Sequence, residues 1–166
     1  MANRISLAKL HIHKGLSEET IAFDADVMLD GEKIGTATCR GHGDQALVRT
    51  RIAYASLDTI ARAETPSANR IESYRSYGLE TAFKSIEDVV EALVADECDR
   101  RETERLAKRI AKRMLTATYF RTPGGTVRTL NIVGDRAEAL INAKYPGATI
   151  LNKLPINEAV RAMGGA

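Results

Sequence analysis

Residues 39–46, CRGHGDQA, bring together several side chains that could do chemistry. His42 stands between two glycines, with Cys39, Arg40 and Asp44 close by in the chain. A histidine next to a carboxylate can act as a general acid or base, and a cysteine near a histidine can act as a nucleophile. Glycines also allow positive φ angles and the close approach of another group. The stretch is therefore the first candidate for a catalytic or binding site.

The spacing at this turn favours binding over catalysis. Cys39 and His42 are three residues apart, which does not by itself align a nucleophile with its base. The sequence has no GxSxG, HExxH or Walker lysine loop and no GxGxxG after a strand, and TPGGT at 122–126 lacks the following lysine of a phosphate loop. We expect a strand-ending turn whose glycines serve backbone geometry, with Arg40, His42 and Asp44 as contact residues and no catalytic residue.

A metal site is a second hypothesis for the histidines. His11 and His13 share one face of an expected strand, and His42 or Cys39 could approach that strand to complete a zinc-like ligand set. No Cys/His spacing in the chain matches a compact zinc site, and two histidines on the exposed face of a strand explain the pattern more simply. We expect no metal and no cofactor.

Residues 100–113, RRETERLAKRIAKR, form a basic segment with seven basic and two acidic side chains, a net charge of +5. A basic amphipathic helix can follow phosphates, lie on an anionic membrane or dock an acidic partner. The expected binding residues here are Arg101, Arg105, Lys108, Arg109, Lys112 and Arg113.

The alternative for this segment is a structural role, in which the charged side chains only keep one face of a helix in solvent. Residues 85–99 carry six acidic and no basic side chains, so acids precede bases, an order that complements a helix dipole if the helix is continuous. Glu104 and Lys108 also have the spacing of a favourable i,i+4 pair. The two interpretations are both open at the level of the sequence.

Tyrosines and arginines form a further candidate set, because both residue types anchor protein interfaces and stack on bases. Packing is the alternative, since only 5% of the residues are aromatic and there is no tryptophan, so the core needs several of these rings. The set consists of Tyr54, Tyr74, Tyr77, Tyr119, Arg70, Arg75 and Arg121.

Length and composition bound the class of protein. The 166 residues are expected to form a single domain, 1–166, and 44% hydrophobic with 28% charged residues is typical of soluble globular proteins. No apolar run approaches the ~18 residues of a membrane span, and the N-terminus lacks the apolar region of a secretory signal. Two cysteines outside any CxxC agree with a reducing compartment. We therefore expect a cytoplasmic protein that does not associate with membranes.

The first half of the chain has the patterns of an antiparallel sheet. Alternating apolar residues and the Asp30-Gly31 turn predict a β-hairpin over residues 20–40. A two-residue loop would turn Ile34, Thr36 and Thr38 to the core, whereas a three-residue loop with a bulge would turn Gly35, Ala37 and Cys39 there.

Strands are expected to flank this hairpin on both sides. ISLAKLHIH predicts a strand with a bulge near Ala8. ALVRTRIAY fits a fourth antiparallel strand or the start of a helix through Ala63, and we favour a strand followed by a short helix from Ser56. Residues 65–78 have turn residues and no clear period, so a connector is expected there.

The second half has helical periodicity. Ser85 and Asp88 resemble a capping box, and apolar spacing continues to about Tyr119, as one helix or as two separated at the polar DECDRRETE. Pro123-Gly124-Gly125 ends this region, and a short strand is expected after it. DRAEALINAKYPG predicts a helix that Pro146-Gly147 stops, followed by an extended piece and a last helix with Pro155 near its start. The expected fold is α+β, an N-terminal antiparallel β-meander packed against C-terminal helices.

The stretch LDGEKIGTATCRGHGD resembles a hairpin and Gly-His-Gly turn found in small, largely uncharacterised proteins of bacteriophages and integrated mobile elements. The likeness covers residues 20–44 and the ILN at 150–152. In those proteins the turn tends to read Asp-Gly-His-Gly-Gly, whereas here Arg40 replaces the acidic residue and Asp44 the second glycine.

The resemblance implies an accessory protein of a mobile element that binds host machinery, including CRISPR or other defence complexes. We therefore expect a non-catalytic binding protein, an inhibitor of a bacterial defence complex, whose partner is a host protein or ribonucleoprotein. Direct binding to DNA or RNA is the alternative, and a small hydrolase or nucleotide-processing enzyme centred on His42 is a third.

Overall fold

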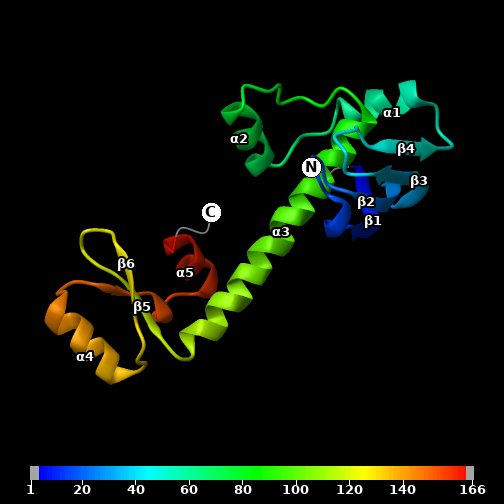
Figure 1. Cartoon of the computed structure of the whole chain (residues 1–166). Coiled ribbons are helices and arrows are strands. Elements are labelled where there is room, and N and C mark those ends of the chain that lie inside the picture. The colour runs from blue at the N-terminus through cyan, green and yellow to red at the C-terminus, as the bar shows by residue number, and fades with distance from the viewer. Residues whose placement is uncertain (1–3, 164–166) are drawn as a thin grey trace. The chain divides into compact units, whose positions relative to one another are not determined.

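The computed structural model describes residues 4–163 of the chain (Figure 1). Its contacts group into two compact units, residues 1–99 and residues 100–166. The expectation of a single domain over residues 1–166 stays a prediction. The α+β class is confirmed, since a four-stranded antiparallel sheet at the N-terminus is followed by helices. No helix in residues 4–163 combines the length and apolarity needed to cross a membrane.

The sheet of the first unit is the expected meander, with its strands hydrogen-bonded in sequence order. The register of the first pair shifts between Ala8 and His11, and Lys9 has a φ of 50°, so the expected bulge is confirmed. A short 3-10 helix, Lys14–Leu16, follows the first strand. The strands are β1 (Ile5–Ile12), β2 (Phe23–Leu29), β3 (Glu32–Cys39) and β4 (Leu47–Thr50).

The central hairpin combines the two registers that the sequence left open. Asp30 and Gly31 form a two-residue loop with φ angles of 50° and 86°, and Leu29 pairs with Glu32. A register shift then follows, so that Val27 pairs with Gly35. Ala37 consequently lies buried in the core, as the bulged alternative required.

Two helical segments complete the core of the first unit. Helix α1 (Tyr54–Ala61) begins two residues before the expected Ser56, and the first half of α3 (Ile86–Met114) packs with it against the meander. Ser85 and Asp88 bond to each other's backbone N–H groups, which confirms the capping box. The buried side chains of this core include Ile5, Phe23, Val27, Ala37, Val48, Leu57, Ala61, Phe83, Ile86, Val89, Val90 and Val94.

The expectation of a connector over residues 65–78 is wrong, because helix α2 (Ala68–Ser76) lies there. The Ser67 side chain accepts a hydrogen bond from the Arg70 N–H and caps the helix. Arg70 then bonds to Asp96 and Asp99 on α3. The helix has no buried residue, which agrees with the absence of a clear apolar period, and these two ion pairs link it to α3.

Helix α3 is a single helix of 29 residues, so the polar stretch does not break it. Ion pairs formed by Asp96, Asp99 and Arg100 satisfy charged side chains along that stretch. The expected end at about Tyr119 is wrong, since the helix ends at Met114 and residues 118–121 form a strand. Pairing on both of its edges, with Thr118 and Phe120 buried, outweighs the local helical periodicity.

The second unit has its own three-stranded antiparallel sheet, in the order β6-β5-β7. The PGG stretch forms the turn between its first two strands. Helices α4 and α5 belong to this unit, so the helices in the core with the meander are α1 and α3 rather than those nearest the C-terminus. The elements are β5 (Thr118–Arg121), β6 (Val127–Leu130), α4 (Asp135–Lys144), β7 (Thr149–Ile150), a 3-10 helix (Leu151–Lys153) and α5 (Ile156–Ala162).

Candidate functional site

The turn after β3 exposes all three of its expected contact residues, Arg40, His42 and Asp44. His42 Nδ1 lies 3.1 Å from Glu18 Oε2, and both side chains are more than half exposed. Cys39 instead donates through Sγ to the Asp44 carbonyl at 3.4 Å. In the part of the chain that the structure describes, His42 therefore has no hydrogen bond to Cys39 or Asp44, and no nucleophile and base are aligned here.

The backbone of the turn is bound to the loop before β2. The Gly41 carbonyl accepts hydrogen bonds from the N–H groups of Glu18, Glu19 and Thr20 at 3.1, 2.9 and 3.2 Å. Gly43 donates its N–H to Thr20 Oγ1 at 3.3 Å. Gly41 and Gly43 have φ angles of 87° and 89°, which favour glycine. The glycines thus serve backbone geometry, as the sequence predicts.

His11 in β1 and His13, just after the end of β1, are both exposed. His13 Nε2 lies 2.5 Å from Asp24 Oδ1, and His11 pairs with Asp24 across the β1 and β2 ladder. Between residues 4 and 163, no group of three or more His, Cys, Asp or Glu side chains is arranged to hold a metal ion.

The second half of α3 presents a basic face, defined as Arg101, Arg105, Lys108, Arg109, Lys112 and Arg113. All of these side chains except the partly exposed Arg101 are exposed, and their spacing places them on adjoining turns. Ile110 is buried, and Leu106 and Met114 are half-buried on the other side. This half of the helix is amphipathic, because its apolar side is buried or half-buried while its basic side chains are exposed.

Five members of the basic face, all but Arg101, form no ion pair with any residue that the structure describes. Glu104, the expected partner of Lys108, pairs with Arg100 instead. The helix dipole acts only within the last turn, where Lys112 and Arg113 lie. The dipole does not account for Arg105, Lys108 and Arg109, which lie before the last turn. Stabilisation of the helix end therefore explains only part of the basic face.

Charge is divided unequally between the two units. Residues 1–99 contain 17 acidic and 11 basic side chains, a net charge of −6, whereas residues 100–166 contain 5 acidic and 13 basic side chains, a net charge of +8. The overall charge of +2 hides this division. An asymmetry of this kind is typical of a chain with one anion-binding part.

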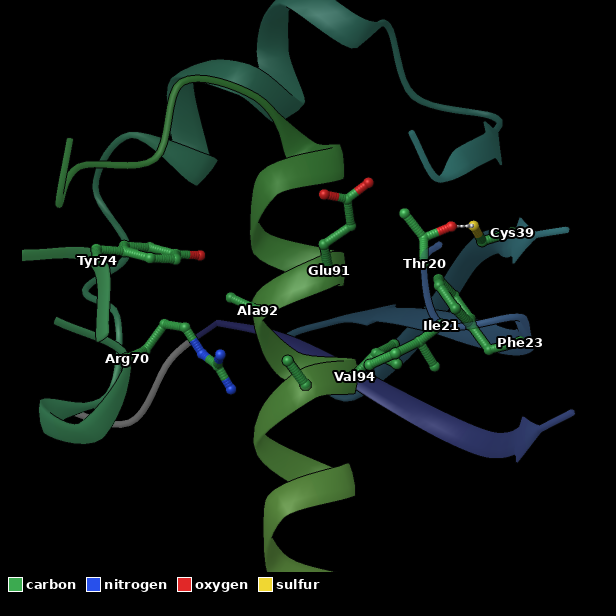
Figure 2. A pocket seen from close by; sticks show the side chains of 10 residues that line it. Thr20, Ile21, Phe23, Cys39, Arg70, Tyr74, Glu91, Ala92 and Val94 are labelled. Carbon is green, nitrogen blue, oxygen red and sulfur yellow. Dashed lines mark hydrogen bonds between the residues drawn. The ribbon is translucent and has the colours of Figure 1, made fainter. Parts of the chain in front are cut away.

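A pocket of about 230 Å³ opens in the first unit between α2, α3 and the meander (Figure 2). Two residues of the tyrosine and arginine set, Arg70 and Tyr74, line it from α2, and in Figure 2 both extend toward α3. The remaining lining residues are Thr20, Ile21, Phe23, Cys39, Glu91, Ala92, Val94 and Ala95.

Glu91 and Tyr74 are the groups in this pocket whose titration is shifted. Burial raises the pKa of Glu91, partly offset by the hydrogen bond that the Ala46 N–H donates to its Oε1 at 2.7 Å. Burial also raises the pKa of Tyr74. The sequence gives no sign of this pocket, because its residues come from segments up to 75 positions apart and Glu91 lies within a run of other acids.

The other aromatic candidates have different environments. Tyr54 donates its hydroxyl hydrogen bond to the Val48 carbonyl, and Tyr119 is half-buried in β5. Tyr77 is 78% exposed. Arg121 donates to the Ala162 carbonyl at 2.6 Å and so ties β5 to the end of α5. Hydrogen bonds within the chain therefore occupy Tyr54 and Arg121, and Tyr119 is partly packed in the sheet.

The chain matches no family model, no curated protein and no solved structure.

Proposed function

We propose that this chain is a non-catalytic binding protein that docks onto nucleic-acid phosphates through the basic face of α3. The observation that carries the proposal is the row of five exposed basic side chains without acidic partners in the described residues, within a unit of net charge +8. Arg105 and Arg113 are eight residues apart, about 12 Å along a helix. That length matches roughly three to four base pairs of a duplex.

A host ribonucleoprotein, such as a CRISPR-type defence complex, is the partner that we propose for this face. Such a complex exposes phosphates to a basic helix, and the resemblance of residues 20–44 to proteins of mobile elements supports a role as its inhibitor. The turn residues Arg40, His42 and Asp44 would add a second contact surface from the first unit, since all three are exposed.

Direct binding to free DNA or RNA is the second candidate, and the excess of positive charge in residues 100–166 favours it. Both candidates use the same phosphate chemistry. Capture of host components with the tagged protein, with and without nuclease, separates them. A stoichiometric ribonucleoprotein supports the inhibitor, whereas nucleic acid with no protein supports direct binding.

Fluorescence anisotropy with labelled duplex DNA, single-stranded DNA and RNA tests the shared chemistry. The variant Arg105→Glu/Arg109→Glu/Arg113→Glu should lose at least about tenfold in affinity, because three attractive charges become repulsive. The matched control, Arg49→Glu/Arg51→Glu/Arg75→Glu, makes the same change in net charge at exposed residues of the first unit. Equal losses in the two variants, or an affinity independent of salt, would contradict the proposal.

A further inference from the structure

The pocket of the first unit combines an apolar floor with polar groups at its rim. Ile21 and Phe23 lie beside Val94 of α3, and Ala92 points to the side of the helix where Tyr74 and Arg70 lie (Figure 2). Glu91 directs its carboxylate to the side of the pocket where Thr20 and Cys39 lie. The Tyr74 ring reaches across from α2 with its hydroxyl end toward α3. A ligand here would meet apolar walls along its length and polar atoms at one end.

The electrostatics of the pocket favour a cation. Among the described residues that line it, the one basic side chain, Arg70, is 15% exposed and is held by two carboxylates, Asp96 at 3.0 Å and Asp99 at 2.9 Å. Arg70, Asp96 and Asp99 together have a net charge of −1. Glu91 adds a further carboxylate that accepts only the Ala46 N–H within the described part of the chain. An anionic ligand would therefore face three acids and an arginine that is already neutralised.

The size of the pocket limits the ligand to a small group. Pockets for drug-sized ligands enclose about 300–1,000 Å³, and this one encloses about 230 Å³. A nucleotide would bring phosphates to a negatively charged rim and would need more room than the pocket offers. A single aliphatic chain with a charged end matches both the volume and the apolar floor.

We propose that this pocket binds an aliphatic cation, an alkylammonium or alkylguanidinium group whose charged end pairs with Glu91. The Tyr74 hydroxyl lines the same pocket and forms no hydrogen bond to the described residues, so it is available as a further acceptor. The aliphatic chain lies against Ile21, Phe23 and Val94. A free amine and a lysine or arginine side chain of a partner protein share this chemistry. The site lies in the first unit and is independent of the basic face.

Titration of the ¹⁵N-labelled full chain with n-pentylammonium chloride tests the proposal. Amide signals of Ala92, Val94 and Ala95 should shift in a saturable manner, and pentan-1-ol, a neutral molecule of similar length, should bind at least about tenfold more weakly because it lacks the charge. Equal binding of the alcohol and the amine would overturn the proposal, since the pocket would then recognise only the apolar chain.

The source of the cation is distinguished by a second pair of probes, n-butylammonium and N-acetyl-lysine methylamide. Both present a four-carbon chain with one ammonium charge, but only the second carries it on a peptide backbone. Tighter binding of n-butylammonium supports a free amine as the ligand, and tighter binding of the blocked lysine supports a side chain of a partner. Binding of neither probe, together with no response to n-pentylammonium, would overturn the proposal.

Glu91→Gln is the decisive variant, because glutamine keeps an oxygen to accept the Ala46 N–H while it removes the charge. It should weaken n-pentylammonium binding about tenfold or more and leave the binding of pentan-1-ol unchanged. Glu72→Gln, an exposed change of the same charge on α2 outside the pocket, is the matched control. Unchanged amine affinity in Glu91→Gln, with the chain folded as judged by its amide spectrum, would also overturn the proposal.

Discussion

The backbone of Gly41 lies directly against that of Leu16: a Cβ atom on residue 41 would sit 2.2 Å from the Leu16 carbonyl oxygen. The Leu16 oxygen belongs to the backbone and the Cβ atom would be bonded directly to the backbone of residue 41, so no side-chain rotation could relieve the overlap. The same glycine has a φ of 87° and accepts three N–H groups through its carbonyl. The turn of residues 39–46 is therefore held in place by its backbone.

Gly41→Ala should destabilise the protein by about 2 kcal/mol or more, through positive φ and the overlap with Leu16. The free energy of unfolding in urea measures this effect. Gly15→Ala is the matched control, since a Cβ atom on residue 15 would meet open space out to 4 Å and the φ of Gly15 is not positive. A Gly41→Ala protein as stable as the Gly15→Ala protein would show that the turn adopts another conformation.

Asn152 should be a stabilising residue of the second unit. Its Oδ1 accepts the Tyr119 N–H at 2.7 Å, and its Nδ2 donates to the carbonyls of Met114 at 3.1 Å and Ala117 at 2.9 Å. Asn152→Ala should cost about 2–3 kcal/mol, because three polar backbone groups lose their partner. Hydrogen exchange at the Tyr119 amide should also accelerate.

Asn142→Ala provides the control for that prediction. Asn142 is exposed on α4, and a surface substitution of this kind should change stability by less than about 0.5 kcal/mol. Asn152→Asp keeps the acceptor for Tyr119 but not the two donated bonds, so it should not restore wild-type stability. Equal stability of Asn152→Ala and Asn142→Ala would contradict the stabilising role of Asn152.

The ion pair between Arg4 and Asp30 should make stability depend on pH. The hydrogen bonds and positive charge of Arg4 lower the pKa of Asp30 from its ordinary value of 3.8. The unfolded chain therefore binds this proton more readily than the folded one, so the pair stabilises the fold above the ordinary pKa and is lost as the pH falls through the lowered pKa.

Asp30→Asn removes this contribution while keeping a residue that tolerates the φ of 50° at the turn. The stability difference between wild type and variant, measured by urea unfolding, should be largest at neutral pH and shrink at acid pH. Arg4→Gln should give the same pattern. A difference that is constant from neutral to strongly acid pH would assign the effect to the turn rather than to the ion pair.

Single substitutions on the basic face should alter the salt dependence of nucleic-acid binding. If Lys108 contacts a phosphate, Lys108→Ala should reduce the slope of log affinity against log salt concentration by about 0.9 on duplex DNA. Arg75→Ala, in α2 of the first unit, should leave the slope unchanged. Anisotropy titrations between low and high salt measure both slopes. A Lys108→Ala slope equal to that of the unmodified chain would remove this residue from the interface.

Local patterns predict the N-terminal sheet well. Alternation over residues 20–40, the Asp30-Gly31 turn, the bulge near Ala8 and the capping box at Ser85 and Asp88 all occur in the structure. Each of these signals depends on residues that are neighbours in the chain, through φ preferences or side-chain periodicity. The sequence alone therefore determined the α+β class and the exposed basic helix.

Only the tertiary structure decided which residues meet across long stretches of chain. Arg70 of α2 pairs with Asp96, 26 residues further along the chain, and β5 pairs with β6 and β7. The local patterns predicted a connector in place of α2 and a helix in place of β5, and both predictions were wrong. The pocket is likewise lined by residues far apart in the chain, from Thr20 to Ala95. The unequal division of charge can be counted in the sequence, but the sequence does not show where to divide the chain. Contacts between distant residues set the boundary after residue 99, and only then are the charges of the two units known.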